Sequence, residues 1–395
     1  MSTHLSLPAT SPWRGLFPIA QEPDLVYFNT AGEGPLCTVA EAALEQYRYV
    51  KTYPHKKVVR EAFTVPKAIR EAGAALIGAD PAGCGLVGST NYGINIVAQG
   101  YPWKPGDRVI VFEGEFPACV YPFMNLESQG VIVDYCPSPD GNPDYAALDT
   151  LITPTTRVIV ASWVQFFNGF THDLAHLKAV ADRVGALVVV DASQGVGINV
   201  MDARALGLDA VTFSGHKTLC APVGSGFFYL DPRHRDLIPV TYQGWLSNMP
   251  GEDFNDLIQY RMLENVDGRR WETGSDAQVV TLPFLAMLEW FLAQGPDKLQ
   301  AHVRGITEAL VEGLRARGCP VSPPDGYRST ICSFRPPAGA DPSPTYNALR
   351  EANVICSLRE NWIRLSPHVY NDATDVERFF ARCDAALGVV AVPAE

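Results

Sequence analysis

Two short apolar runs near the middle of the chain each end in side chains that could do chemistry. Leu187–Val190 ends at Asp191, and Ala210–Phe213 ends at the segment SGHK, Ser214–Lys217. Short apolar runs with polar borders are typical of strands buried on both faces, and the separation of these two predicts a strand–helix–strand unit. Since open α/β sheets bind ligands at the carboxyl ends of their strands, a carboxylate, a hydroxyl, an imidazole and an amine should open into one crevice.

These groups fit the chemistry of pyridoxal phosphate (PLP). The Lys217 amine can form a Schiff base with the aldehyde of PLP. The Asp191 carboxylate can keep the pyridine nitrogen protonated, so that the ring withdraws electrons, and Ser214 and His216 would complete the lining. The alternative is a solvated lysine after a strand and an aspartate that caps a helix. We favour the cofactor site because other parts of the chain agree with it.

The segments DASQ at Asp191 and SGHK at Ser214 resemble the class V aminotransferase family of PLP-dependent enzymes. This family includes cysteine desulfurases, selenocysteine lyases, kynureninases and isopenicillin epimerase-like proteins. The resemblance extends from VYFNTAGEGP, which begins at Val26, to IRLSPHVYN, which begins at Ile363. It implies the α/β fold of PLP-dependent transferases of fold type I, with a mixed, mostly parallel seven-stranded sheet in a large domain and a small α+β C-terminal domain.

We therefore divide the chain into an extended N-terminal arm (1–25), a large PLP-binding domain (26–280) and a small C-terminal domain (281–395), since domains commonly hold ~100–200 residues. Gly224–Leu230 follows Lys217 too closely for a crossover helix, which predicts an antiparallel strand. A long helix should begin near Thr281. The C-terminal pattern then predicts helix 296–317, strand 329–334, helix 344–352, strands 354–358 and 362–365, and helix 373–387.

The stretch Gly88–Asn95 could bind the phosphate of the cofactor. Ser89 and Thr90 stand where a helix should begin, and a helix start offers free N–H groups and the positive end of its dipole. Capping of the helix by these hydroxyls is compatible with that role. The overlapping Gly83–Gly88 matches GxGxxG, but a dinucleotide site needs its strand before the motif, and here Leu86-Val87 looks like a strand inside it.

The resemblance assigns further contacts to the cofactor ring. Phe116 stands where desulfurases often carry a histidine that stacks on the pyridine ring, and as in the epimerase-like branch it can stack but cannot transfer a proton. Gln165 would contact the phenolic oxygen, with Asn168 in reserve, and Gln194 would be the second donor to that oxygen. These roles rest on the resemblance, because an isolated phenylalanine is more often a core residue.

The closing motif implies a substrate site. Arg364 would clamp the α-carboxylate of the substrate, because a planar guanidinium binds carboxylates through paired, charge-assisted hydrogen bonds. Arg359 is a second candidate, and Asn29 of the opening motif would lie near the substrate. Group II cysteine desulfurases carry a persulfide-forming cysteine between the two arginines. Here only residues 360–363 (ENWI) separate them, and Cys356 reads as a core residue, so a persulfide relay is not expected.

Ser275 ends the segment RRWETGS, which resembles a motif whose final hydroxyl reaches the cofactor phosphate of the neighbouring subunit, so we expect a homodimer. A net charge of −12 argues against nucleic-acid binding. No apolar run is long enough to span a membrane, and nine cysteines without a CxxC pair predict a cytoplasmic protein with reduced thiols. His172 and His176 have no recognisable third ligand, so no metal is expected.

The predicted activity is PLP-dependent chemistry on an α-amino acid, through an external aldimine and a quinonoid. Lys217 would hold the cofactor and then act as the general base, while Asp191 stabilises the ring. Because a persulfide cysteine is missing, we favour β-lyase cleavage of a C–S bond in a sulfur-bearing amino acid, a desulfurase-like reaction. A class V aminotransferase and an amino-acid epimerase are the alternatives. A non-catalytic PLP-binding protein is the alternative from a different class.

Overall fold

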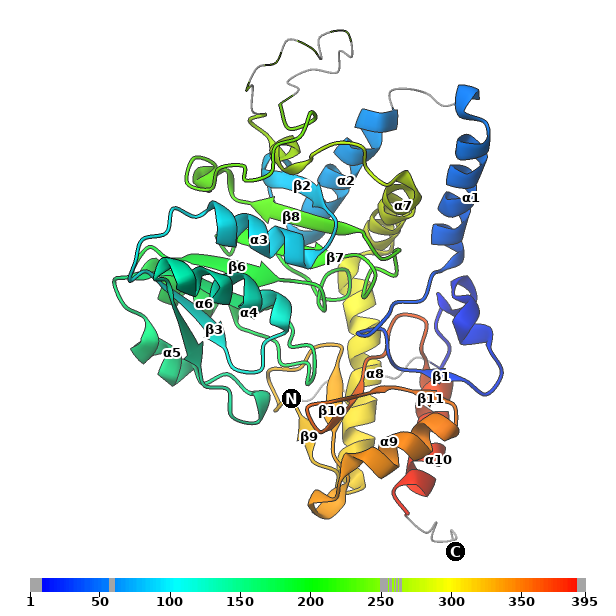
Figure 1. The fold of residues 1–395 in the computed structure, drawn as a ribbon. Coiled ribbons are helices and arrows are strands. Elements are labelled where there is room, and N and C mark those ends of the chain that lie inside the picture. Colours follow the sequence, from blue (N-terminus) through cyan, green and yellow to red (C-terminus); the bar gives the residue numbers. More distant parts are fainter. Residues whose placement is uncertain are drawn as a thin grey trace, which may run out of the picture.

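The computed structural model describes residues 9–56, 61–248 and 265–388, together with residues 255, 258, 260 and 262. Its centre is a seven-stranded sheet in the order β2-β8-β7-β6-β5-β3-β4 (Figure 1). The strands are β2 (Cys84–Val87), β3 (Arg108–Phe112), β4 (Ile132–Cys136), β5 (Thr156–Ser162), β6 (Leu187–Asp191), β7 (Ala210–Ser214) and β8 (Gly226–Leu230). Within this sheet β8 runs antiparallel to β2 and β7, the strands on either side of it, and the other described pairs are parallel, so the predicted mixed, mostly parallel sheet is confirmed.

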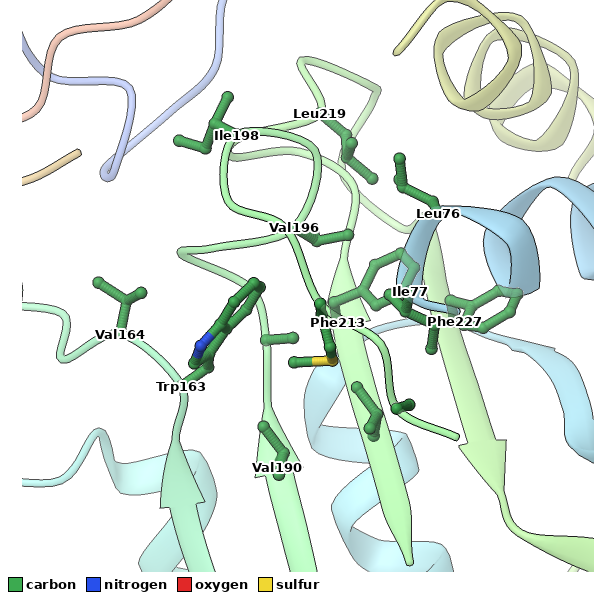
Figure 2. Close-up of a cluster of buried hydrophobic side chains, with 14 of the residues drawn as sticks. Leu76, Ile77, Trp163, Val164, Val190, Val196, Ile198, Phe213, Leu219 and Phe227 are labelled. Atoms are coloured by element: carbon green, nitrogen blue, oxygen red, sulfur yellow. The ribbon is translucent and has the colours of Figure 1, made fainter. Parts of the chain in front are cut away.

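Helices cover both faces of this sheet. One face carries α2 (Glu61–Ile77), α5 (Tyr145–Leu151), α6 (Leu174–Asp182) and α7 (Gln278–Gln294), with α1 (Thr38–Thr52) beside α7, and the other carries α3 (Thr90–Gly100) and α4 (Pro117–Met124). In β6, Val188 and Val190 enter the first core, whereas Leu187 and Val189 enter the second, as the pleat requires. Figure 2 shows part of the first core, where Ile77 lies among the side chains of neighbouring strands. Burial on both faces explains why these strands are continuous apolar runs.

A second, smaller unit follows α7. It contains a four-stranded antiparallel sheet, in the order β12-β13-β10-β9, and three helices. Its elements are α8 (Pro296–Ala316), β9 (Val321–Ser322), β10 (Cys332–Phe334), α9 (Pro342–Glu351), β11 (Val354–Ile355), β12 (Ser357–Arg359), β13 (Trp362–Leu365) and α10 (Ala373–Ala386). The predicted elements are therefore present within a few residues, except that the expected strand 354–358 is split into β11 and β12. No single described helix is long and apolar enough to cross a lipid bilayer. Among the described helices, only α7 and α8 taken together reach that length and composition, and an 84° bend separates them.

Residues 9–25, the described part of the segment before the first strand, do not form the extended arm that was predicted for residues 1–25. Residues Arg14–Leu16 and Pro18–Gln21 form short 3-10 helices, and the side chains of Trp13 and Phe17 are buried. Arg14 also forms an ion pair of 2.7 Å with Asp375 on α10. In residues 9–25, the burial of these two aromatic side chains outweighs the tendency of the prolines to keep the segment extended.

The first strand belongs structurally with the C-terminal elements. β1 (Val26–Tyr27) pairs in parallel with β11, and Val26 and Phe28 lie in the core formed by α8, α9 and α10. The chain then crosses to the large sheet, so residues from both ends of the sequence meet beside it. The domain limits at 26 and 280 stay predictions.

The connection between β6 and β7 contains no helix, so the predicted strand–helix–strand unit is wrong. Residues 192–209 form a series of turns instead. Three glycines, at positions 195, 197 and 207, interrupt this stretch, and Gly197 has a φ of 82°, which favours turns over a helix. The irregular path keeps Ser193 and Gln194 at the edge of the sheet, next to Asp191.

Candidate active site

A cavity of about 370 Å³ opens at the carboxyl ends of β6 and β7, on the side predicted from the sequence. It brings together most of the predicted site residues, which come from six separate segments of the chain. Those that line it are Ser89, Thr90, Phe116, Asp191, Gln194, Ser214, His216, Lys217, Arg359 and Arg364. Asn29, Gln165 and Ser275 do not line it. Phe166 and Ser193 line it but were not predicted.

Lys217 and Asp191 face the same space from neighbouring strand ends. Burial lowers the pKa of the Lys217 amine from its ordinary value, although the charge of Asp191 opposes this shift. Asp191 is 7% exposed, and its Oδ1 accepts a hydrogen bond of 2.9 Å from Ser193 N. The Lys217 Nζ atom lies 5.1 Å from the centre of the Phe116 ring. An amine that loses its proton readily therefore shares a cavity with a buried carboxylate.

The loop that carries Lys217 is fixed by the opening segment of the chain. Gly34 N donates a hydrogen bond of 2.8 Å to His216 O. A Cβ atom at position 34 would lie 2.0 Å from Lys217 O, so this close approach requires glycine. Burial and the nearby Lys217 charge lower the pKa of His216 to about 4, which keeps this imidazole neutral at physiological pH.

A cluster of three hydroxyl groups stands at the start of α3. Thr90 N donates to Ser214 Oγ at 2.9 Å, and Thr90 Oγ1 lies 2.8 Å from Ser214 Oγ and 2.5 Å from Ser193 Oγ. Ser89 is the N-cap residue, yet its side chain makes no capping hydrogen bond, so simple capping is not its role. The Ser89 hydroxyl and the positive end of α3 are thus available to an anion. The motif DASQ was the available signal for Ser193.

The aromatic wall of the cavity is made by Phe116 and Phe166, whose ring centres lie 5.3 Å apart in an edge-to-face arrangement. Gln165 turns away from the cavity, and its Nε2 donates a hydrogen bond of 2.9 Å to Glu115 Oε1. Asn168, the reserve candidate, donates to Gly141 O at 2.9 Å and also lies outside the cavity lining. The loop after β5 therefore presents the Phe166 ring to the cavity, where a polar contact from Gln165 was predicted.

Gln194 is held with one polar atom unused. Its Nε2 donates a hydrogen bond of 2.9 Å to Ala31 O, while its buried Oε1 has no hydrogen-bond partner. An unpaired buried acceptor costs free energy, typically about 1–3 kcal/mol. The predicted donor of Gln194, Nε2, is thus already engaged by Ala31 O, and its free capacity is to accept a hydrogen bond from a donor on a bound molecule.

Arg364 is almost completely buried and is supported from three directions. Nη1 donates to Phe166 O at 2.5 Å, and Nη2 donates to Asn29 Oδ1 at 3.3 Å and to Ser357 Oγ at 3.4 Å. Burial, reinforced by the charge of Arg359, lowers the pKa of Arg364 to about 9. Its Nε has no partner. Asn29 thus orients the guanidinium rather than lining the cavity itself.

Arg359 and Arg364 lie on the same face of the β12–β13 hairpin. Ser357 pairs with Arg364 and Arg359 pairs with Trp362, and alternate residues of a strand share a face. The two turn residues, Glu360 and Asn361, both have left-handed backbone angles, with φ of 47° and 59°. A two-residue turn of this kind fixes the register of the hairpin and hence the relative position of both guanidinium groups.

Ser275 lies on the surface, outside the cavity that holds Lys217. It is exposed and has a φ of 60°. Its chain neighbours Thr273 and Asp276 line a second cavity of about 440 Å³, together with Tyr92 and Tyr242. Both tyrosines are more than half exposed, and Tyr92 belongs to α3, the helix that begins beside the first cavity.

The two histidines that raised the question of a metal lie apart from this cavity. His172 precedes α6 and is buried beside Tyr145, and His176 is within α6. Burial lowers the pKa of His172 to about 3. Among the described residues, no group of three or more His, Cys, Asp or Glu side chains could hold a metal ion.

Comparison with known proteins gives consistent matches over most of the chain. The model of the family described as aminotransferase class-V matches residues 26–379. A probable cysteine desulfurase of Methanothermobacter thermautotrophicus is 31% identical over 312 residues, which span 75% of this chain and 76% of that protein. A solved structure of a C-DES mutant with glycine covalently linked to the PLP cofactor has a TM-score of 0.86 at 23% identity and covers 94% of this chain and 99% of that one. The structure of the cystine C–S lyase C-DES with its reaction product cysteine persulfide has a TM-score of 0.82 at 24% identity, and it covers 91% of this chain and 97% of that one.

Proposed function

Since the chain belongs to the aminotransferase class-V family of PLP-dependent enzymes, we propose that the cavity around Lys217 binds PLP and an α-amino acid and cleaves a C–S bond at Cβ of that substrate. The observation that carries this proposal is the joint presence of Lys217, Asp191 and Arg364 in one cavity. An amine, a carboxylate and a buried guanidinium are the three groups that PLP chemistry on an amino acid needs.

The residues present fit PLP. Ser89, Thr90 and the start of α3 would hold the phosphate. Asp191 would hold the pyridine nitrogen, Phe116 would stack on the ring, and Gln194 would offer its unpaired Oε1. When bound, PLP supplies an aldehyde that condenses with amines and a ring that draws electrons away from Cα.

Lys217 has the properties of the base that removes the Cα proton. Burial lowers the pKa of its amine, so that a larger fraction is neutral and able to accept a proton near neutral pH. Phe116, which lies over the amine, can exclude water but cannot take part in proton transfer. Of Lys217 and Phe116, only Lys217 can therefore carry out the proton transfer at Cα.

Arg364 has the properties of the group that binds the substrate carboxylate. Its guanidinium is buried, lacks an anionic partner among the described residues and keeps Nε unpaired. A carboxylate would restore the charge balance lost on burial and fix the orientation of Cα toward Lys217. Arg359, on the same face of the hairpin, is the second guanidinium available to the substrate.

Elimination is favoured over a relay through an enzyme persulfide because of the cysteines. The β12–β13 hairpin has only Glu360 and Asn361 in its turn, which leaves no loop for a thiol. Cys356 is buried, and burial raises its pKa to about 12, so its thiolate is scarcely populated. In the proposed reaction the Cα proton passes to Lys217, the C–S bond breaks, and sulfur leaves with the electron pair.

A homodimer is the proposed assembly. Ser275 is exposed and outside its own cavity, so it could contact a cofactor only in another subunit. The second cavity, with Tyr92 and Tyr242, offers exposed aromatic surface next to Ser275 for a second copy of the chain. Aromatic residues of this kind are enriched in protein interfaces.

The reaction type is tested by product analysis. The full-length protein with PLP is incubated with L-cystine or L-cysteine, with and without an added keto acid, and ammonia, keto acid and sulfur products are measured. A C–S lyase releases ammonia and a keto acid without an added acceptor, leaves no sulfur adduct on the protein, and retains its activity in Cys356→Ser. A requirement for a keto-acid acceptor would identify an aminotransferase, and inversion at Cα alone would identify an epimerase. No reaction by a PLP-loaded protein would support the non-catalytic alternative.

A further inference from the structure

Glu115 is a buried carboxyl group beside the site that the proposed reaction does not use. It lies between β3 and α4, one residue before Phe116, and it is 7% exposed. Four donors surround its carboxylate: Ser162 N at 2.7 Å and Gln165 Nε2 at 2.9 Å on Oε1, and Ser162 Oγ at 2.6 Å and Phe116 N at 3.2 Å on Oε2. This carboxyl group therefore ties the turn that carries Phe116 to the end of β5.

The surroundings of Glu115 contain negative charge and no direct cation. Ser162 is the strand partner of Asp191, and the four hydrogen-bond donors around the Glu115 carboxylate are all neutral groups. Burial, with a further contribution from Asp191, raises the pKa of Glu115 to about 7, although the hydrogen bonds from Ser162 oppose this shift. On α4, burial raises the pKa of the Cys119 thiol, and the charges of Glu115 and Asp191 add to this shift.

We propose that Glu115 is a positioning residue of this active site. Its hydrogen bonds hold the Phe116 backbone and the Gln165 side chain, and its negative charge adds to that of Asp191 in stabilising a positively charged cofactor ring. The second effect rests on the proposed function, because it needs PLP in the cavity. A buried carboxylate without a cation is costly, and a cationic ring held by Asp191 would offset that cost through the low-dielectric interior.

The test compares the PLP holoenzyme of the wild type with Glu115→Gln, and uses Glu113→Gln as the control. Glu113 is exposed and lies on the same turn. Removing the Glu115 charge makes protonation of the bound chromophore less favourable, so the midpoint of its pH-dependent absorbance change should fall by ~0.5 pH unit or more. Glu113→Gln should keep the wild-type midpoint. Equal midpoints in all three proteins would overturn the inference and leave the proposed function intact, whereas a wild type that forms no chromophore would overturn both.

A second measurement avoids dependence on a variant that fails to fold. In the full-length wild type with glutamate carboxyls labelled with ¹³C, one carboxyl should titrate near pH 7, and PLP should move its midpoint to lower pH. Glu272 is also buried, but it contacts Arg70 and lines the other cavity, so PLP should leave its titration unchanged. The inference fails if the glutamate titration near pH 7 does not respond to PLP.

Discussion

Burial sets the protonation of the charged groups in this cavity more strongly than any ion pair does. It is the largest cause of the lowered pKa of Lys217, of the pKa of about 9 at Arg364 and of the pKa of about 7 at Glu115. Each charged form has lost hydration that no partner in the chain fully replaces. Ligands that bring the opposite charge restore this loss, which is why such groups gather at binding sites.

Replacement of Arg364 by lysine should weaken substrate binding more than it slows the chemistry. The lysine ammonium cannot bind a carboxylate through two parallel hydrogen bonds. The loss of one charge-assisted bond, ~1.5–3 kcal/mol, should raise KM ~10–100-fold with a much smaller change in kcat. Steady-state kinetics would measure this split. Arg335→Lys is the control, because Arg335 stacks on Trp362 and does not line the cavity; a similar KM in both variants would argue against the assignment.

His172 should make the protein sensitive to acid. Its pKa is about 3 in the folded protein, because it is buried, and ~6.5 in an unfolded chain. Because the folded protein holds His172 in its neutral form, its contribution to the free energy of unfolding is complete above pH ~6.5. This contribution is lost as the pH falls toward 3. His172→Phe should reduce the fall in Tm between pH 7.5 and pH 5, since the neighbouring rings of Phe112 and Phe170 can accommodate a phenyl group. An equal fall in both proteins would contradict this.

The grouping of single residues in one cavity was predictable from the sequence where a motif combines a rare pair of groups. Lys217 and Asp191 come together because Asp191 is the last residue of β6 and Lys217 follows the end of β7, and these two buried strands are parallel neighbours. The direction of Gln165 was not predictable, because it depends on the distant Glu115, which is close only in the folded chain.

At the level of elements, the β12–β13 turn holds backbone strain that can be relieved. Asn361 has a φ of 59°, which costs a non-glycine residue ~1 kcal/mol. Asn361→Gly should therefore equal or exceed the wild type in stability, and Asn361→Val should lose ~1 kcal/mol or more, because a β-branched residue is worse still in this region. Chemical denaturation would rank the three proteins. A valine variant as stable as the glycine variant would be inconsistent with a left-handed backbone conformation at Asn361.

The sheet could be predicted from its apolar runs, and its irregular connections could not. Burial on both faces gives strands such as β6 a continuous apolar pattern that is easily recognised. The β6–β7 connection was misjudged because length alone suggested a helix, while its glycines favour turns. The N-terminal segment was misjudged because its prolines were weighed more heavily than Trp13 and Phe17, whose burial depends on a surface at the other end of the chain.

At the scale of the whole molecule, the cavity lies where the C-terminal unit meets the large sheet. Arg359 and Arg364 come from the β12–β13 hairpin, whereas Asp191 ends β6 and Lys217 follows β7. The contact from Arg364 to Phe166 O joins the two parts. Substrate binding should therefore depend on how these parts are packed together. The cytoplasmic location stays a prediction.

Mixed dimers would test whether the site is shared between subunits. In a dimer of one Lys217→Ala chain and one Ser275→Ala chain, a shared site leaves one cavity with both residues intact. Such preparations should recover PLP retention and activity relative to either variant alone. If Ser275 serves its own subunit, or if the active species is a monomer, mixing should give no recovery.

The most direct measurement is the covalent attachment of PLP to Lys217. The full-length protein is loaded with PLP, reduced with borohydride, digested and examined by mass spectrometry. The predicted result is a reduced PLP adduct on the peptide that contains Lys217, which is lost in Lys217→Ala and kept in Lys178→Ala, where the replaced lysine pairs with Asp209 outside the cavity. A protein that cannot be loaded with PLP, or an adduct on a lysine other than Lys217, would contradict the assignment of this cavity as the active site.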